Sequence, residues 1–168
     1  MSACGSSNNL AATPQRVLLE MTYCVGMRLD RGLIFMSDTR TNAGVDDVSQ
    51  VCKMRHWEVP GERVITLLSA GNLATTQAVV SLLDERTKAP ADRDPSILAA
   101  PSMFQVATIV GDTLREVIAS LRNEGQEASS KFRASLIVGG QIKGSEPRLF
   151  LIYPEGNFIE AGDDSPFF

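Results

Sequence analysis

A predicted β-hairpin between positions 22 and 40 limits the fold of this chain more than any other feature. Residues 23–29 alternate between large apolar side chains and small or polar ones, which is the period of a strand. The triplet Asp30-Arg31-Gly32 supplies turn-forming residues, and residues 33–37 form a second, mostly apolar run. Such a hairpin is expected to open a sheet. It also occurs in unrelated proteins, so on this pattern alone Thr22 fits an ordinary surface position.

Candidate functional residues follow the hairpin in a definite order. Asp38 stands at the end of the second run, and Lys53 comes after a polar loop. Gly71 lies where a predicted strand runs into a predicted helix. On pattern alone, Lys53 fits a solvated strand residue equally well, and Gly71 fits an ordinary turn glycine better. The pattern therefore leaves their roles open.

Similarity to a known family is carried by three stretches, residues 21–25, 36–46 and 68–77. They resemble the bacterial Anbu (ancestral β-subunit) proteins, which are related to proteasome-type β subunits, and the resemblance runs from 21 to about 167. It implies an α+β fold, the Ntn-hydrolase four-layer αββα sandwich. Because family members continue well past Phe168, it also implies that residues 22–168 are the N-terminal major part of a domain truncated on its C-terminal side. The second pair of helices and a Ser or Asp that orients the nucleophile's amine would lie in the missing part.

The same resemblance implies catalytic roles. Thr22, as the first residue of the mature chain, would be the nucleophile and its freed α-amino group the base. Lys53 would be the ammonium that lowers the pKa of this amine, and Asp38 would hold Lys53 charged and oriented. Gly71 would donate its backbone N–H to the oxyanion at the strand-to-helix turn. The interval from Asp38 to Lys53 is shorter than in proteasome subunits, which leaves the direction of Lys53 open.

The first 21 residues differ in character from the rest. Residues 1–14 are rich in Ser, Asn and Ala, and the apolar run 17–19 is far too short for a signal peptide or a membrane span. This extension is expected to be disordered. Three explanations stay open: a propeptide, residues added for expression, or a start codon assigned too early. Met21 directly before Thr22 favours the last, because an initiator Met before a small side chain is readily removed.

The remaining chain mixes the periods of strands and helices. The alternating or apolar runs predict strands, and the stripes of apolar residues at helical spacing predict two helices that pack on the sheet; Ser102 is the predicted cap of the second helix. The expected strands are 51–57, 64–70, 132–138, 148–153 and 158–161, and the expected helices are 72–86 and 102–123.

Composition excludes several classes of function. With 168 residues, 43% of them hydrophobic, the chain is expected to form one soluble domain. A net charge of -4 argues against nucleic acid or an anionic membrane as the main partner. Three cysteines at irregular spacing fit reduced thiols in a cytoplasm. Cys52 and His56 are too few ligands for zinc, so no metal or cofactor is expected. His56 is the only histidine, and a Ser-His or Cys-His hydrolase built on it would lack a nucleophile elbow.

Two functions remain at this level. The first is a threonine peptidase subunit of a self-compartmentalising homo-oligomer, a ring or spiral, acting on peptides or unfolded proteins. The second is a noncatalytic assembly subunit or inactive fragment of the same fold. The mature N-terminus discriminates between them, because a threonine nucleophile of this kind needs a free α-amine. The sequence leaves open the natural substrate, the cleavage preference, the oligomer size and any unfoldase partner.

Overall fold

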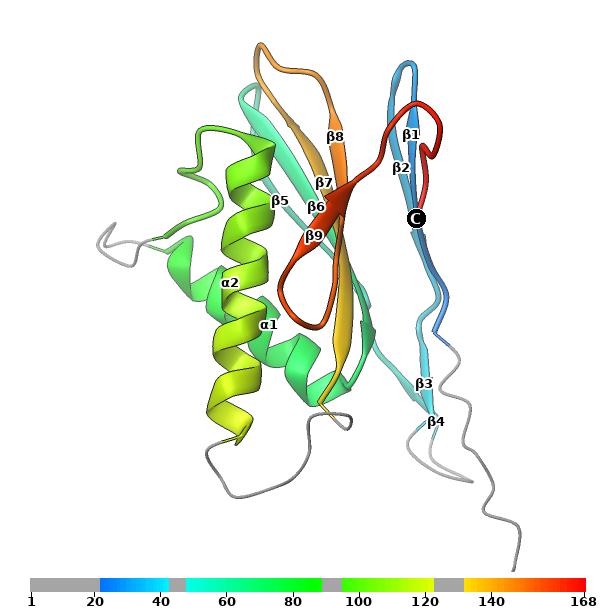
Figure 1. The fold of residues 1–168 in the computed structure, drawn as a ribbon, viewed down its shortest axis with the longest axis vertical. Helices are drawn as coiled ribbons and strands as arrows, with labels where there is room; N and C mark the ends of the chain where they lie inside the picture. Colours follow the sequence, from blue (N-terminus) through cyan, green and yellow to red (C-terminus); the bar gives the residue numbers. More distant parts are fainter. Residues whose placement is uncertain (1–21, 43–47, 89–94, 123–131) are drawn as a thin grey trace, which may run out of the picture.

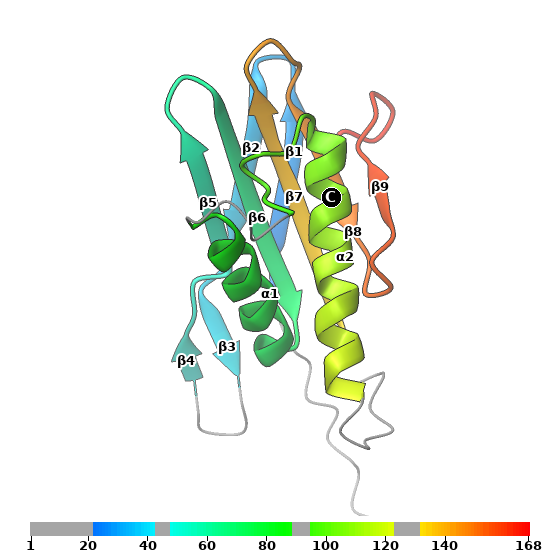
Figure 2. The same cartoon turned by 90° about the vertical axis from the view of Figure 1, so that its left-hand side faces the viewer.

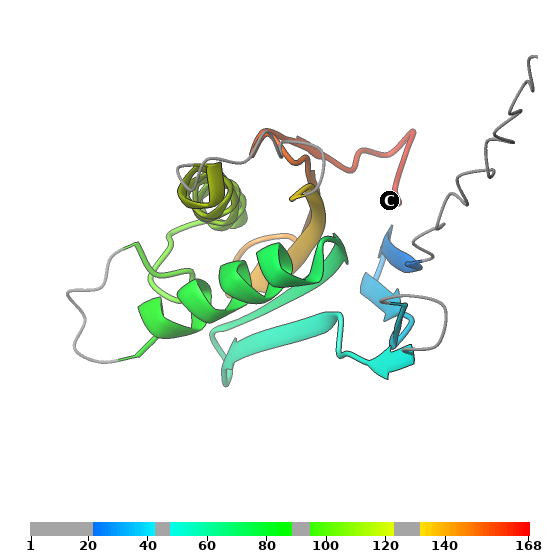
Figure 3. The ribbon, with the colours of Figure 1, turned by 90° about the horizontal axis from the view of Figure 1, so that it is seen from below.

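The computed structural model describes residues 22–42, 48–88, 95–122 and 132–168, and these form three layers (Figure 1). The helices α1 and α2 cover one face of a five-stranded sheet, and a two-stranded hairpin lies against the other face. Figure 3, seen from below, shows the same order of layers. The elements are β1 (Cys24–Leu29), β2 (Gly32–Ser37), β3 (Arg40–Asn42), β4 (Val48–Gln50), β5 (Met54–Val59), β6 (Arg63–Gly71), α1 (Leu73–Arg86), α2 (Met103–Arg122), β7 (Ala134–Ile142), β8 (Arg148–Ile152) and β9 (Phe158–Glu160).

The α+β class expected from the sequence is confirmed. The fourth layer of the predicted αββα sandwich and the predicted truncation stay predictions. The expectations for positions 1–21, namely disorder, a propeptide or an early start codon, lie outside the described residues.

The five-stranded sheet is antiparallel throughout, in the order β5-β6-β7-β8-β9. Its two central strands, β6 and β7, are nine residues each and pair along their full length, from Arg63 opposite Ile142 to Gly71 opposite Ala134. The edges of this sheet are β5 and β9. Strand β6 ends at Gly71, and this places the beginning of α1 directly at the end of the sheet.

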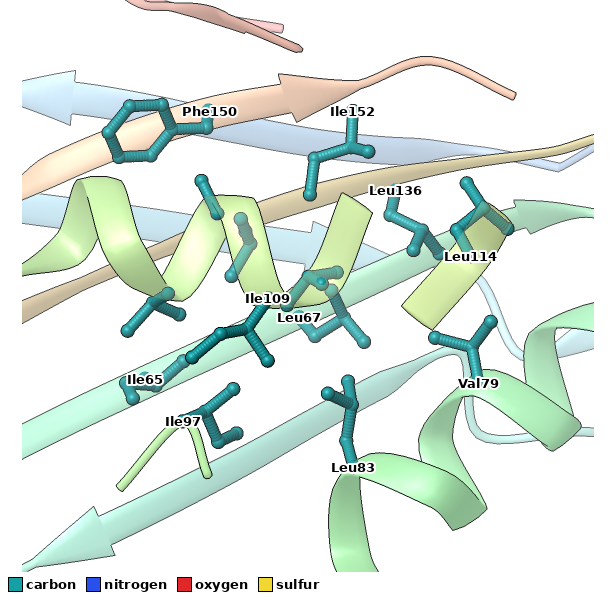
Figure 4. Packing of buried hydrophobic residues seen from close by; sticks show 14 of the residues in the cluster. Ile65, Leu67, Val79, Leu83, Ile97, Ile109, Leu114, Leu136, Phe150 and Ile152 are labelled. Carbon is teal, nitrogen blue, oxygen red and sulfur yellow. The ribbon is translucent and has the colours of Figure 1, made fainter. Parts of the chain in front are cut away.

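Both helices begin at polar caps. The Asn72 side chain accepts a hydrogen bond from Thr75 N at 2.9 Å, and the Ser102 Oγ accepts one from Gln105 N at 3.2 Å, as the cap prediction for Ser102 requires. The apolar sides of the helices then meet the sheet in one core (Figure 4). Burial of these side chains is the main force that holds the two layers together. Labelled in Figure 4 are Ile65, Leu67, Val79, Leu83, Ile97, Ile109, Leu114, Leu136, Phe150 and Ile152.

A second, smaller core joins the hairpin to the opposite face of the sheet. Leu33 and Phe35 of β2 pack there against Ile137 of β7 and Leu149 of β8. Gly26 of β1 lies so close to the sheet that an added Cβ would come within 2.9 Å of Ile137 Cγ2. A side chain at this position would push the hairpin away, so Gly26 allows the two layers their close contact.

The end of the chain also joins the hairpin layer. Phe168 and Gly26 exchange two backbone hydrogen bonds of 2.9 and 3.0 Å, and Arg28 N donates to Pro166 O at 2.6 Å. Figure 1 shows this last segment beside β1, on the side away from β2. No local pattern in the sequence predicts this pairing, because the partners are more than 135 positions apart.

The structure departs from the predicted boundaries at three places, and the other boundaries agree within one residue. Strand β5 covers Met54–Val59 and not 51–57, and β7 covers Ala134–Ile142 and not 132–138. The expected polar loop after Asp38 contains a short ribbon of β3 and β4. The Val51 N donates to Thr39 O at 2.8 Å, which closes this ribbon before the chain enters the sheet at β5. Pairing between strands has here overridden the local sequence pattern. Among the described helices, neither is long and apolar enough to cross a bilayer.

The face of the hairpin that points away from the sheet is apolar and exposed. Because Leu33 and Phe35 point inward, their neighbours on the strand point outward. Ile34 is 44% exposed, Met36 50% and Phe167 59%. Together with Leu29 and Met27 these residues form what we call the outer hairpin face. An exposed apolar patch of this kind favours association.

We expect the outer hairpin face to bind a hydrophobic dye such as anilinonaphthalene sulfonate. The double change Ile34→Gln with Met36→Gln should remove most of the dye signal and reduce self-association, measured by light scattering, because both side chains lose apolar area. The matched control is Val64→Gln with Ile159→Gln, which changes two similarly exposed residues outside this face and should leave the signal unchanged. A well-folded monomer with little dye binding would contradict the prediction.

Candidate active site

The ends of three strands meet at one place beside the sheet. Thr22 lies just before β1, Asp38 just after β2, and Lys53 just before β5. Strands β1 and β2 are antiparallel, with Cys24 opposite Ser37, so the residues before one and after the other are neighbours. Asp38 N donates to Tyr23 O at 2.9 Å, and Tyr23 N donates back to the Asp38 Oδ1 at 3.0 Å. Hairpin geometry therefore holds the Asp38 carboxylate beside Thr22.

Lys53 is the centre of the site. Its side chain is only 6% exposed, and its ammonium group donates to both Asp38 oxygens, at 2.9 and 3.1 Å, and to Arg40 O at 2.6 Å. The same Nζ lies 3.1 Å from Thr22 Oγ1 and donates to it. The direction of Lys53, which the sequence left open, is thus toward Thr22. These oxygen atoms satisfy the N–H donors of the enclosed ammonium group.

The Asp38 carboxylate is held ionised. Burial by itself would raise the pKa of Asp38, but the hydrogen bond and charge of Lys53 and the N–H groups of Tyr23 and Arg40 outweigh it. The pKa of this carboxyl is therefore below its ordinary value. Arg40 contributes to the site through its backbone: its N–H donates to Asp38 Oδ2 at 3.3 Å, and its carbonyl oxygen accepts from Lys53 Nζ. Its side chain is exposed and makes no ion pair with any described residue.

Two residues that sequence analysis did not select help to position Lys53. Ser69 donates to the Lys53 carbonyl twice, from its N–H at 2.9 Å and from its Oγ at 3.3 Å. The Cys24 Sγ donates in turn to Ser69 O at 3.5 Å, and burial raises the pKa of this thiol although the nearby Lys53 charge opposes the rise. These contacts join β1, β5 and β6. Only the strand register brings the residues together, so no sequence signal could have found them.

Gly71 ends β6 within the same pocket. Its φ is +101°, a conformation that favours glycine, and an added Cβ would lie 2.5 Å from Arg133 O. Asn72 N donates to that same Arg133 carbonyl at 2.9 Å, so the turn into α1 is tightly held. Thr22, Lys53 and Gly71 all line a pocket of about 450 Å³ that opens between β5, β6 and α1. The oxyanion role of Gly71 stays a prediction.

The histidine that a Ser-His or Cys-His hydrolase would need lies away from the site. His56 is exposed on β5 and does not line the pocket that contains Thr22. Cys52 does line it and is exposed, with its Sγ directed to Met54 O at 3.0 Å. Within the described ranges, no cluster of three His, Cys, Asp or Glu side chains could hold a metal ion.

Comparison with known proteins identifies similar structures. Neither a scan against models of protein families nor a search of curated proteins gave a match. Among solved structures, the chain is 50% identical to Anbu (ancestral beta-subunit) from Yersinia bercovieri, with a TM-score of 0.78 over 86% of this chain and 58% of that one. It is 53% identical to an Anbu (Gly-1) mutant from Hyphomicrobium sp. strain MC1, with a TM-score of 0.77 over 88% and 59%.

A third structure is the helical assembly of the Anbu complex from Pseudomonas aeruginosa, at 44% identity and a TM-score of 0.78 over 86% and 58% of the two chains. This chain therefore spans just under three fifths of the length of the structures it matches.

Replacing Asp38 by Asn should destabilise the protein in a pH-dependent way. The pKa of Asp38 in the folded state lies below its unfolded value of roughly 3.9. The carboxylate therefore contributes fully to the free energy of unfolding above that value, and this contribution is lost as pH falls through the folded-state pKa. At pH 7 we expect Asp38→Asn to lower the free energy of unfolding by about 1–3 kcal/mol, since a charged hydrogen bond is lost. Urea unfolding at pH 7, 5 and 3 measures the free energy of unfolding of both proteins. The difference between wild type and Asp38→Asn should shrink at pH 3, and an equal difference at all three pH values would contradict the prediction. Glu58→Gln, exposed on β5, is the control.

Proposed function

Because this chain belongs to the Anbu (ancestral β-subunit) family over most of its length, we propose that it is an N-terminal-threonine peptidase subunit. One observation carries the proposal: the buried Lys53 ammonium, held by Asp38, lies 3.1 Å from Thr22 Oγ1. A hydroxyl beside a fixed positive charge is favoured as a nucleophile, because the charge stabilises the alkoxide character that develops during attack. The reaction is hydrolysis of a peptide bond through an acyl-enzyme.

The first step forms an ester. With Thr22 as the first residue, its neutral α-amine accepts the Oγ proton while Oγ bonds to the substrate's carbonyl carbon. The carbonyl π electrons move to its oxygen, and when they return the C–N bond breaks. The leaving nitrogen takes the proton from the α-ammonium and departs as the first product.

The second step restores the enzyme. A water molecule gives a proton to the α-amine as its oxygen bonds to the ester carbon, and the C–Oγ bond then breaks. Thr22 Oγ takes the proton back, and the substrate's acyl part leaves as a carboxylic acid. One water is consumed for each bond cleaved. Gly71 is the proposed donor of a backbone N–H to the oxyanion in both steps, at a helix N-terminus that adds positive potential.

Lys53 is an electrostatic group in this scheme and not the base. Its ammonium protons are directed to Asp38, to the Arg40 carbonyl and to Thr22, so it is a donor on every side. A free α-amine has a pKa of roughly 7.7–8.0, and a nearby ammonium need lower it only slightly to leave the amine mostly neutral. The amine can then act as a base near neutral pH.

Self-association and a fourth layer belong to the same proposal. The related complex from Pseudomonas aeruginosa forms a helical assembly, and we propose that this chain also associates with itself, as a ring or spiral. The apolar outer hairpin face supports a four-layer αββα sandwich, because a sheet between two layers needs both faces covered. Peptides or unfolded proteins are the proposed substrates. A cytoplasmic location stays a prediction, and no unfoldase is assigned.

A noncatalytic assembly subunit is the second candidate. The observation that favours it is the same outer hairpin face, which would serve association whether or not Thr22 is terminal. The two candidates differ in one chemical requirement, a free α-amine at Thr22.

Activity should require Thr22 as the first residue. An internal Thr22 carries an amide nitrogen, which is not a base, so the loss should be roughly 10²- to 10⁴-fold, the usual contribution of a general base. We would compare a protein that begins Met21-Thr22, from which the Met is removed, with the 168-residue chain and with Thr22→Ala, using fluorogenic peptide amides. The intact mass of each of the three proteins verifies its N-terminal residue. Equal hydrolysis by all three proteins would exclude Thr22 as the nucleophile, and no hydrolysis by any of them would favour the assembly subunit.

Lys53 and Asp38 should act as a unit. Loss of the Lys53 charge in Lys53→Met raises the pKa of the α-amine, so the rise of activity with pH should move to higher pH. Asp38→Asn misplaces Lys53 and should shift the profile the same way. The double variant should lower kcat/KM little more than either single change, because each single change already removes the interaction between Lys53 and Asp38. The measurement is kcat/KM against pH, and additive losses would show that the two residues act independently.

A further inference from the structure

The pocket at Thr22 continues as a groove along one side of β5 and one face of α1. Lys53, just before β5, and Arg55, on β5, both line it. On α1 the lining residues Leu73, Gln77 and Asp84 recur at helical spacing, and from the first to the last the helix rises roughly 16 Å. Figure 2 shows α1 lying along β5 and β6. We call this space the α1–β5 groove.

The far end of the α1–β5 groove is closed by a hydrogen bond between its two walls. Trp57 Nε1 donates to Asp84 Oδ1 at 2.6 Å, two residues beyond Arg55 on β5. The groove floor at the level of Arg55 is its cross-strand partner Leu67, which is fully buried. A side chain that enters from Thr22 therefore runs over an apolar floor between two walls that carry polar groups.

Arg55 is the first charge that such a side chain meets beyond the reaction centre. It lies two residues from Lys53 on the same side of the strand, a step of roughly 6.8 Å. The Lys53 charge is paired with Asp38, whereas the exposed Arg55 side chain has no ion pair or hydrogen bond within the part of the chain that the structure describes. Asp84 lies at the far end of α1 and already accepts from Trp57. Near Thr22 the groove is therefore positive, and it turns negative only at its distant end.

We infer that Arg55 is a specificity-determining residue that binds the carboxylate of an acidic side chain, on the substrate residue whose carbonyl Thr22 attacks. This inference rests on the proposed function. A guanidinium forms two parallel hydrogen bonds with a carboxylate, a match that neither an apolar nor a basic side chain provides. A basic side chain would meet Lys53 and Arg55 before it could approach Asp84. The substrate class is peptides with Glu or Asp at the cleaved position, with Glu preferred for its reach.

The first test measures specificity with three fluorogenic peptides that differ only in Glu, Leu or Lys at the cleaved position. In the protein that begins at Thr22, kcat/KM for the Glu peptide should exceed that for the Leu peptide roughly tenfold, the worth of one charged hydrogen-bonded pair. Arg55→Glu should abolish this preference and favour Lys instead. Arg31→Glu makes the same charge change at the exposed hairpin turn and should leave the ratio unchanged. Circular dichroism checks that each variant is folded.

The second test needs no turnover. Trp57 is the only tryptophan of the chain, and its Nε1 bonds to Asp84, which lines the groove, so its fluorescence should report an occupant. In Thr22→Ala, the Glu peptide should bind at least several-fold more tightly than the Leu peptide, and Arg55→Glu should remove the difference. Selective binding without hydrolysis by the Thr22 protein would overturn the peptidase, and of the inference it would leave only the binding of an acidic side chain by Arg55. Hydrolysis without a preference that depends on Arg55 would overturn the inference alone, and neither binding nor hydrolysis would overturn both.

Discussion

A single buried cation organises the site. Lys53 is almost fully enclosed, and a charge in such a position is tolerated only when oxygen atoms replace the water it has lost. Asp38 and the Arg40 carbonyl supply these oxygens from the end of the hairpin, while Ser69 holds the Lys53 backbone to the sheet. The need to satisfy one ammonium group therefore ties the hairpin layer to the five-stranded sheet at the point where Thr22 stands.

The layers place this cation with little freedom. The inward side of the hairpin contacts the sheet through Leu33 and Phe35, and Gly26 permits the close approach. The outward side of the same two strands remains apolar and exposed. Since a strand presents opposite faces with alternate residues, one short sequence supplies both the contact that builds the site and the surface that would carry a further layer or a neighbouring subunit.

The charges of the site follow a gradient along β5. Lys53 is neutralised by Asp38 beside Thr22, Arg55 is the next charge on the same side of the strand, and Asp84 lies at the far end, bonded to Trp57. The period of two that places Lys53 beside the nucleophile also places Arg55 where a substrate side chain would lie. Catalytic charge and substrate selection thus come from one strand, which explains how a small pocket can combine both.

The sequence by itself determined the elements and the order of the chemical groups. Alternation and turn residues specified the hairpin, Asn72 and Ser102 marked the helix starts, and the α+β class followed from the periods along the chain. The order of Thr22, Asp38, Lys53 and Gly71 along the chain could also be read from the sequence. These signals are local, because the residues that carry them are neighbours along the chain or on one face of an element.

Only the tertiary structure decided which distant groups meet. The direction of Lys53, the contribution of the Arg40 carbonyl and the contacts of Ser69 all depend on strand register and on how the hairpin stacks on the sheet. The pairing of Phe168 with Gly26 depends on the same long-range geometry. A register shift of one residue turns every side chain to the other face, so no local pattern can state which of two faces a lysine or an arginine will occupy.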